Sequence, residues 1–301
     1  MSQITTILKN HITSANLRPS TYGVYERYLQ NYIEPFFSDT TCSELNNELM
    51  QNFADKITNN EVSASTAKGI ISLLKKGLAG HYPPGIFEVR FEEKSLNDVE
   101  VFTVEEQRAL ENCAAKSDSV NRLSVFLSLY TGIRIGELCG LMWQDVDFAK
   151  SEFFVRRTIQ RIKNTDPAND AKTIVTFMGL NGPLSRLIPL PSFLINMLSE
   201  NYKVSTGKYV ISKTDGFVEP RGLQYRFKSL LNQVGLKLVG FQTMRHTFAV
   251  RALENNFDVV ALSKIMGHAT PFVTYNRYAT MINEENRIRK SMEYLAKAML
   301  G

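Results

Sequence analysis

The chain has 301 residues, 44% of them hydrophobic and 22% charged, which is ordinary for a globular protein and leaves room for two domains. No apolar run approaches a membrane-spanning length and the N-terminus lacks the regions of a secretory signal, so we expect a cytoplasmic protein without a membrane partner. The net charge of +5 is weak support for a nucleic-acid partner, and the three cysteines lack metal-ligand spacing, so we expect no metal site.

The segment before residue 80 has the pattern of a small helical bundle. Ser20 can cap a helix whose apolar stripe reaches Ile33, and Pro35 is expected to end that helix. Further helices are expected after Ser43 and after Ser65, and the last one carries lysines opposite its apolar side. The bundle is therefore predicted to bind DNA phosphates through Ser65, Thr66, Lys68 and Lys75.

Residues 83–85, Pro-Pro-Gly, break the helical pattern, and an acidic stretch follows them. We therefore expect a helical domain over 1–85, a linker over 86–101 and a second domain over 102–301. Lys and Arg balance Asp and Glu at 7 to 7 in residues 1–85, fall behind at 7 to 12 in 86–150, and exceed them at 21 to 11 in 151–301. A phosphate-rich partner would require such a basic excess, although a solvated basic face would give the same count.

The second domain is expected to begin with a helix capped by Thr103 in the string TVEEQ. An apolar helix over 120–130 is stopped by Thr131-Gly132, and the string IRIGELCGLMW is expected to continue as a further helix. Residues 152–162, 173–177 and 187–190 are rich in β-branched and aromatic side chains, which predicts strands. The predicted fold class is mainly α with a small antiparallel β-sheet.

The stretch from residue 241 to 279 places three chemically notable side chains at helix ends. Arg245 lies just inside a helix start, His268 follows Gly267, and Tyr278 lies near the end of a helix that Thr270-Pro271 would begin. Helix N-termini are natural phosphate sites. An arginine, an imidazole and a phenol that converge on a phosphate suggest nucleophilic phosphoryl transfer. Taken alone, His268 is better explained as a residue that simply follows a helix-ending glycine.

Several strings resemble the tyrosine recombinase (phage integrase) family in both order and spacing. They are TGIRIGEL, LMWQDVDF, SRLIPLP, MRHTFAVRALENN and IMGHAT, followed by Tyr278. The strings LRPSTYGVYERYLQNYIEPFF and SASTAKGIISLLKKGLA resemble the family's core-type DNA-binding domain, especially in integrases of phages and conjugative transposons of Gram-positive bacteria. The resemblance covers nearly the whole chain. It implies an N-terminal helical, SAM-like DNA-binding domain and an α+β catalytic domain.

The resemblance also implies a role for each candidate residue. Arg134 and Arg245 would clamp the scissile phosphate of DNA, and His268 would donate a hydrogen bond to it. Tyr278 would attack the phosphorus, form a 3′-phosphotyrosyl link and release a 5′-hydroxyl. Because the link retains the phosphoester energy, rejoining needs no ATP, metal or other cofactor. Tyr275 is the rival nucleophile, but the family's spacing from His268 favours Tyr278.

Two positions depart from the family pattern. Gln242 stands where a histidine is usual, and glutamine can donate to a phosphate oxygen but cannot take a proton. In the family, a lysine in the turn that corresponds to residues 178–184 protonates the leaving oxygen, but this turn contains no lysine here. Lys172 and Lys163 are the nearest candidates, and we retain Lys172. These gaps leave open a catalytically weakened relative that acts as a DNA-binding regulator or accessory factor. A type IB topoisomerase would share the chemistry.

The second domain offers its own basic side chains for DNA contact, namely Arg156, Arg157, Arg161, Arg221, Arg226 and Lys228. The resemblance implies double-stranded DNA as partner and a homotetramer on two DNA sites. It is compatible with a monomer in solution, and also with accessory proteins that bend DNA or set the direction of recombination. It also implies a bacterial or phage-encoded protein that associates with the nucleoid when bound to DNA. The tail after residue 283 has apolar residues at helical spacing, which suits packing on a neighbouring protomer or back on its own domain.

Overall fold

The computed structural model describes residues 3–59, 62–82, 89–90, 99–164, 169–278, 281–282 and 284–300. The chain divides into two compact units. One consists of Met1–Asp98 with Ile162–Ile174, and the other of Val99–Arg161 with Val175–Gly301. Most of the linker expected over 86–101 lies outside the described residues. We describe each unit by itself.

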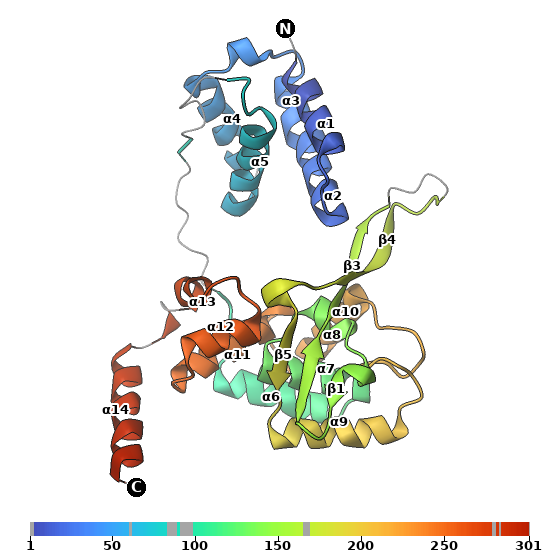
Figure 1. Cartoon of the computed structure of the whole chain (residues 1–301), viewed down its shortest axis with the longest axis vertical. Helices are drawn as coiled ribbons and strands as arrows, with labels where there is room; N and C mark the ends of the chain where they lie inside the picture. Colours follow the sequence, from blue (N-terminus) through green and yellow to red (C-terminus); the bar gives the residue numbers. More distant parts are fainter. Residues whose placement is uncertain are drawn as a thin grey trace. The chain divides into compact units, whose positions relative to one another are not determined.

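The first unit is a helical bundle around its own apolar core. On its first helix Ile4, Leu8 and Ile12 recur at four-residue spacing and are almost completely buried. Ser63 caps the last helix, where its hydroxyl accepts a hydrogen bond from the Thr66 backbone N–H at 3.3 Å. The helices are α1 (Ile4–Ser14), α2 (Pro19–Tyr28), α3 (Glu34–Phe37), α4 (Asn47–Asn59) and α5 (Ala64–Gly77) (Figure 1).

The expectation that Ser20 caps the second helix and that Pro35 ends it was wrong. Pro19 is already helical, so the cap position belongs to Arg18. A π-helical turn over Leu29–Ile33 then joins α2 directly to α3. Pro35 lies in the first turn of α3, where a missing N–H costs little.

The second unit combines helices with a small antiparallel sheet and with the part of a two-stranded ribbon that lies outside Ile162–Ile174. One sheet has the order β1-β2-β5 and is antiparallel, with Phe153 opposite Ile188; β3 and β4 form a separate two-stranded ribbon. The expected single sheet is therefore divided in two. Along β5 Arg186 and Ile188 are buried while Leu187 is exposed, so alternation turns Arg186 inward. The strands are β1 (Val146–Asp147), β2 (Glu152–Val155), β3 (Arg157–Lys163), β4 (Thr173–Gly179) and β5 (Arg186–Pro189).

The helices of this unit include the expected one capped by Thr103, whose hydroxyl accepts from the Glu106 backbone N–H at 3.1 Å. The helix expected after Gly132 is short and ends at Cys139, because Gly140 caps it and the backbone at Met142 is already extended, with φ −112° and ψ 156°; a 3₁₀ turn over Trp143–Asp145 follows. No helix in the described ranges is long and apolar enough to cross a membrane. The helices are α6 (Val104–Ala115), α7 (Ser119–Thr131), α8 (Ile135–Cys139), α9 (Ser192–Val204), α10 (Pro220–Gln233), α11 (Gln242–Glu254), α12 (Val259–Met266), α13 (Pro271–Tyr278) and α14 (Glu284–Leu300) (Figure 1). The predicted class, mainly α with a little antiparallel β-structure, is confirmed.

Candidate active site

Two helices of the second unit end on glycines in the left-handed backbone region. Gly132 follows α7 with φ 63° and Gly267 follows α12 with φ 64°, a conformation that L side chains avoid. Each turn directs its carbonyl oxygen at an arginine on the other segment: Gly267 O accepts from Arg134 Nη2 at 3.1 Å, and Gly132 O accepts from Arg245 Nη1. The α7–α8 turn and the α11–α13 segment are thus joined crosswise.

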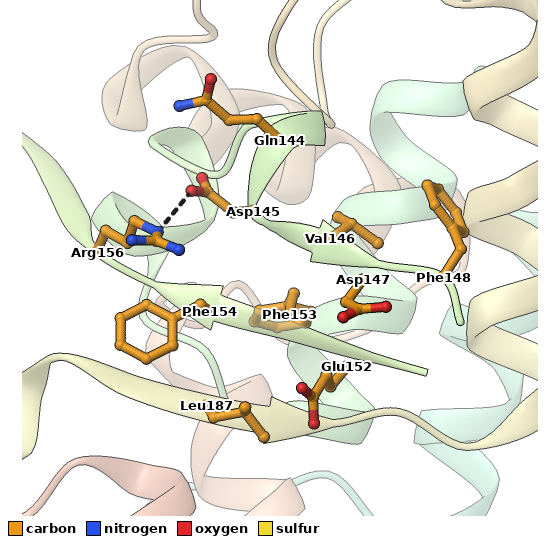
Figure 2. A pocket seen from close by; sticks show the side chains of 10 residues that line it. All are labelled: Gln144, Asp145, Val146, Asp147, Phe148, Glu152, Phe153, Phe154, Arg156 and Leu187. Carbon is orange, nitrogen blue, oxygen red and sulfur yellow. Dashed lines mark ion pairs between the residues drawn. The ribbon is translucent and has the colours of Figure 1, made fainter. Parts of the chain in front are cut away.

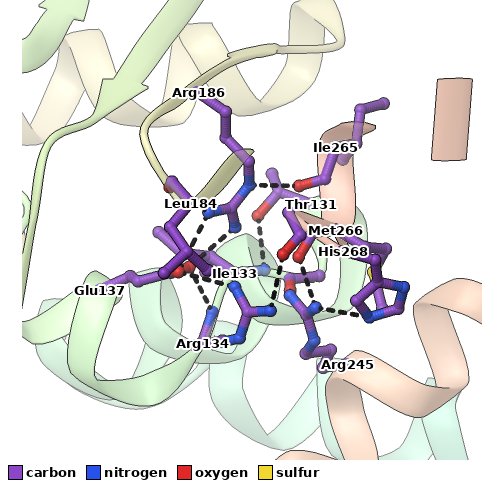
Figure 3. Close-up of polar contacts among 12 residues, drawn as sticks. Thr131, Ile133, Arg134, Glu137, Leu184, Arg186, Arg245, Ile265, Met266 and His268 are labelled. Carbon is purple, nitrogen blue, oxygen red and sulfur yellow. Dashed lines mark hydrogen bonds and ion pairs between the residues drawn. The ribbon is translucent and has the colours of Figure 1, made fainter. Parts of the chain in front are cut away.

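Glu137 joins Arg134 to a third arginine, Arg186 (Figure 3). Arg186 donates to both carboxylate oxygens of Glu137 at 3.0 and 2.7 Å, and Arg134 donates to one of them at 2.8 Å. Arg186 also donates through Nε to the carbonyl oxygen of Ile265 at the end of α12. Burial alone would raise the pKa of Glu137, but the bonds and charges of Arg186 and then Arg134 outweigh it and lower that pKa. The carboxylate therefore stays ionised and holds both cations.

Arg245 is the most deeply buried of the three arginines, at 2% exposed. Besides Gly132 O, it donates to Met266 O at 2.5 Å and to Nε2 of His268 at 3.2 Å. Burial and the neighbouring charge of Arg134 lower the pKa of Arg245 to about 9, so the guanidinium is still charged at neutral pH. An anion beside it would offset this penalty. Within the described residues Glu137 pairs with Arg134 and Arg186, and no carboxylate pairs with Arg245, so the three arginines carry a positive charge excess that suits a phosphate.

His268 stands at the edge of this cluster, directly after Gly267. Its Nδ1 lies 2.7 Å from Thr274 Oγ1, and its Nε2 faces Arg245. Guanidinium has no acceptor, so Nε2 must accept from Arg245, and the ring hydrogen lies on Nδ1 and is donated to Thr274. Burial and the charge of Arg245 lower the pKa of His268 to about 4, so this ring is neutral. To donate to a phosphate through Nε2, the ring has to gain a proton, which an arriving anion favours.

Tyr278 ends α13 and is only 1% exposed, whereas Tyr275 is 47% exposed. The Oη atom of Tyr278 lies 2.9 Å from Nδ1 of His246, the residue after Arg245 on α11. Burial raises the pKa of Tyr278, against the opposing charges of Arg245, Arg277 and Arg134. The phenol is thus buried, next to a buried imidazole and within the field of the arginines.

The structure brings Arg134, Arg245 and His268 into one hydrogen-bonded network and places Tyr278 one helix further on. Gln242 is exposed at the first position of α11, and Lys172 is exposed just before β4. Within the described ranges, neither of these two side chains makes a hydrogen bond or an ion pair with the network. Sequence reasoning did not assign the remaining partners, Glu137, Arg186 and His246.

Some of the side chains expected to contact DNA in the second unit already bond to other residues of the chain. Arg157 is half-buried and donates to Gly140 O and to both oxygens of buried Asp145. In this structure Arg157 therefore stabilises the fold and does not face solvent as a DNA contact would. Arg161 pairs with Glu219 at 2.8 Å. The exposed candidates are Arg156, Arg161, Arg221, Arg226 and Lys228 in this unit, and Ser65, Lys68 and Lys75 in the first, with Thr66 half-buried at the start of α5.

A separate hollow of about 420 Å³ opens over the β1-β2-β5 sheet (Figure 2). Asp147 and Glu152 line it, while Arg156 turns to Asp145, with 3.2 Å between Nε and the carboxylate. The carboxylates make this hollow a poor phosphate site, so the arginine cluster is the better candidate.

Comparison with known proteins decides the family. The phage integrase family matches residues 100–285, and its N-terminal SAM-like domain matches residues 5–58. The chain belongs to the phage integrase family. The expected resemblance to tyrosine recombinases is thereby confirmed, over both the helical domain and the catalytic domain.

Two relatives of this integrase-family chain align with most of its length. A tyrosine recombinase XerC-like protein of Caldanaerobacter subterraneus subsp. tengcongensis is 27% identical, over 89% of this chain and 76% of its own. The tyrosine recombinase XerA of Thermococcus onnurineus is 23% identical, over 97% and 96%. Among solved structures, the Tn1549 transposon integrase in complex with transposon right end DNA has a TM-score of 0.81 at 18% identity, over 98% of this chain and 100% of that chain. That likeness supports the fold.

Proposed function

We propose that this chain is a site-specific DNA recombinase that cleaves and rejoins DNA through a 3′-phosphotyrosyl link to Tyr278. One observation carries the proposal: Arg134, Arg245 and His268 form a single cationic network beside the helix that ends at Tyr278. A protein that only binds DNA has no use for a phosphate clamp next to a buried phenol. Family membership supports the same reaction.

The arginines supply the electrostatic part of the chemistry. Their guanidinium groups present paired donors to the non-bridging oxygens of the scissile phosphate, where charge grows as the pentavalent transition state forms. Such donors stabilise the transition state more than the ground state because they are already in place. His268 adds a donor once protonated, Gln242 can donate from the start of α11, and Lys172 stays our candidate for protonating the leaving 5′-oxygen.

We further propose that double-stranded DNA is held by both units and that a homotetramer assembles on two DNA sites. The solved relatives include a lambda integrase tetramer bound to a Holliday junction, with a TM-score of 0.66 at 17% identity over 92% of this chain and 77% of that chain. On α14 the apolar side chains Ile288, Met292 and Leu295 are each at least half exposed, which suits packing on a neighbouring protomer. The helical domain would span 1–85, joined by a linker over 86–101, with accessory proteins directing the product.

A nicked suicide duplex tests the proposal, because the short strand released on cleavage diffuses away and traps the covalent adduct. We expect the intact protein to form an adduct, Tyr278→Phe to form none, and Tyr275→Phe to form it at close to the unmodified rate. The DNA-binding affinity of each protein is measured in parallel by gel shift. Absence of any adduct under conditions where DNA is bound would refute the proposed function.

A further inference from the structure

His246 is a buried histidine that the reaction described above does not yet use. It lies on α11 beside Arg245 and is 8% exposed. Its Nδ1 atom is 2.9 Å from Oη of Tyr278, and the two ring centroids are 5.8 Å apart at an angle of 54°. This is the distance of a hydrogen bond to the atom that would attack the phosphorus. A group at that distance can take the proton of the nucleophile.

We propose that His246 is the catalytic base that accepts the phenolic proton of Tyr278 when the phosphotyrosyl bond forms. The inference rests on the proposed function and names a residue for a step that the proposed function leaves without one. Gln242, one helical turn earlier on α11, cannot accept a proton, so a base in this region has to come from another side chain.

The protonation state of the ring agrees with this role. Burial, then the charges of Arg277 and Arg245, lower the pKa of His246 to about 4, so the imidazole is neutral at neutral pH and one of its nitrogens is bare. The phenol retains its proton, because burial raises the pKa of Tyr278. With Nδ1 bare and the ring hydrogen on Nε2, Tyr278 donates its hydroxyl hydrogen to Nδ1. A tyrosine held in this way has its lone pairs free for the phosphorus.

The Tyr278 Oη–phosphorus bond forms, the phosphorus–5′-oxygen bond breaks, the phenolic proton moves to Nδ1 of His246, and the leaving 5′-oxygen takes a proton from Lys172, the acid of the proposed function. A base with a pKa of about 4 is weak against a phenol, but two effects correct this. The forming bond to phosphorus makes the tyrosine oxygen far more acidic, and the arriving phosphate anion stabilises the imidazolium. On rejoining, His246 returns the proton to Tyr278.

The test uses the full chain and compares His246→Asn with His246→Ala on the suicide duplex. Asparagine places an amide close to the position of Nδ1, so it keeps a hydrogen-bond acceptor for Tyr278 but cannot take a proton. Because general-base catalysis contributes about 10²–10⁴-fold, we expect both variants to form adduct at least ~100-fold more slowly, with DNA affinity unchanged.

A fluorinated tyrosine at position 278 separates proton transfer from a structural role. Its phenol is more acidic and needs less help from a base, so the rate ratio between the unmodified protein and His246→Asn should shrink towards one. A structural role would leave that ratio unchanged. A duplex with sulfur in place of the leaving 5′-oxygen removes the need for an acid, and it should not rescue His246→Asn.

The outcomes distinguish this inference from the proposed function. No adduct from the intact protein refutes the proposed function; an adduct from His246→Asn at the unmodified rate, or a faster one, refutes the role of His246 alone. If both variants fail to fold, nitrogen-15 NMR of the histidines in the unmodified protein decides. A bare Nδ1 on His246 supports the inference, and a hydrogen on Nδ1 overturns it.

Discussion

Replacing Glu137 by glutamine tests whether one buried carboxylate holds the phosphate clamp together. The Glu137 side chain is 2% exposed and that of Arg186 is 6% exposed, with 3.0 and 2.7 Å between their paired atoms. Glutamine keeps the shape but removes the charge and turns an N–H₂ group towards a guanidinium. Breaking a buried ion pair by removing one partner costs about 3–5 kcal/mol, because the other charge stays buried without compensation. We expect Glu137→Gln to lower the free energy of unfolding by about that amount.

Urea unfolding followed by tryptophan fluorescence measures this loss in the right unit, because Trp143 is the single tryptophan and is buried there. The double variant Glu137→Met/Arg186→Met is the control: with both partners gone, much of the stability should return. The pKa of Glu137 is lowered from 4.5, so its contribution exists above that value and is lost as the pH falls through the lower, folded-state pKa. A loss under about 1 kcal/mol at neutral pH, or one that stays the same in acid, would refute this account of the clamp.

Three further predictions concern the same unit and its DNA. Gly267→Ala should cost at least about 1–2 kcal/mol, because the left-handed backbone disfavours a Cβ and that atom would lie 3.0 Å from Arg186 Nη1. Gly222→Ala is the control and should not destabilise the unit, because Gly222 lies in α10 and its added Cβ would meet no atom outside its own helical turn within 4 Å. The pKa values of His246 and His268 are lowered from 6.5 to about 4 in the folded protein, so between these two pH values the unfolded chain binds more protons than the folded one. The thermal midpoint should therefore fall as the pH drops from 6.5 to 4, and a midpoint that does not change over this range would contradict the burial of both rings in the neutral form. DNA affinity should fall steeply with salt, and Lys68→Ala should make the log–log slope shallower by about one; an unchanged slope would remove Lys68 from the interface.

Local signals in the sequence predicted the elements that surround the site. Thr131-Gly132 correctly ended α7, and Pro271 correctly began the helix on which Tyr278 is the last residue. Those features depend on backbone preferences of a few adjacent residues, so a single sequence can reveal them. The same reasoning failed at Pro35, because a proline ends a helix only when it falls beyond the first turn, and the register of that turn was not known beforehand.

The remaining partners depend on contacts between distant segments. Arg186 lies 49 residues from Glu137, and only the inward side of β5 brings the two together. The alternation in SRLIPL was a usable signal for its burial, but nothing local named its partner. His246 lies 32 residues from Tyr278, and its direction depends on how α11 packs against α13. Neighbouring residues on one helix point about 100° apart, so recognising Arg245 did not reveal where His246 points.

The crosswise bonds from Arg134 and Arg245 to Gly267 O and Gly132 O also bear on the speed of the encounter with DNA. Side chains that main-chain oxygens already hold have little rotational freedom left to lose when a phosphate arrives. The association step then needs no slow ordering of the clamp. Its rate constant should follow diffusion and electrostatic attraction, so that viscosity and ionic strength, rather than side-chain rearrangement, set how quickly the phosphate is engaged.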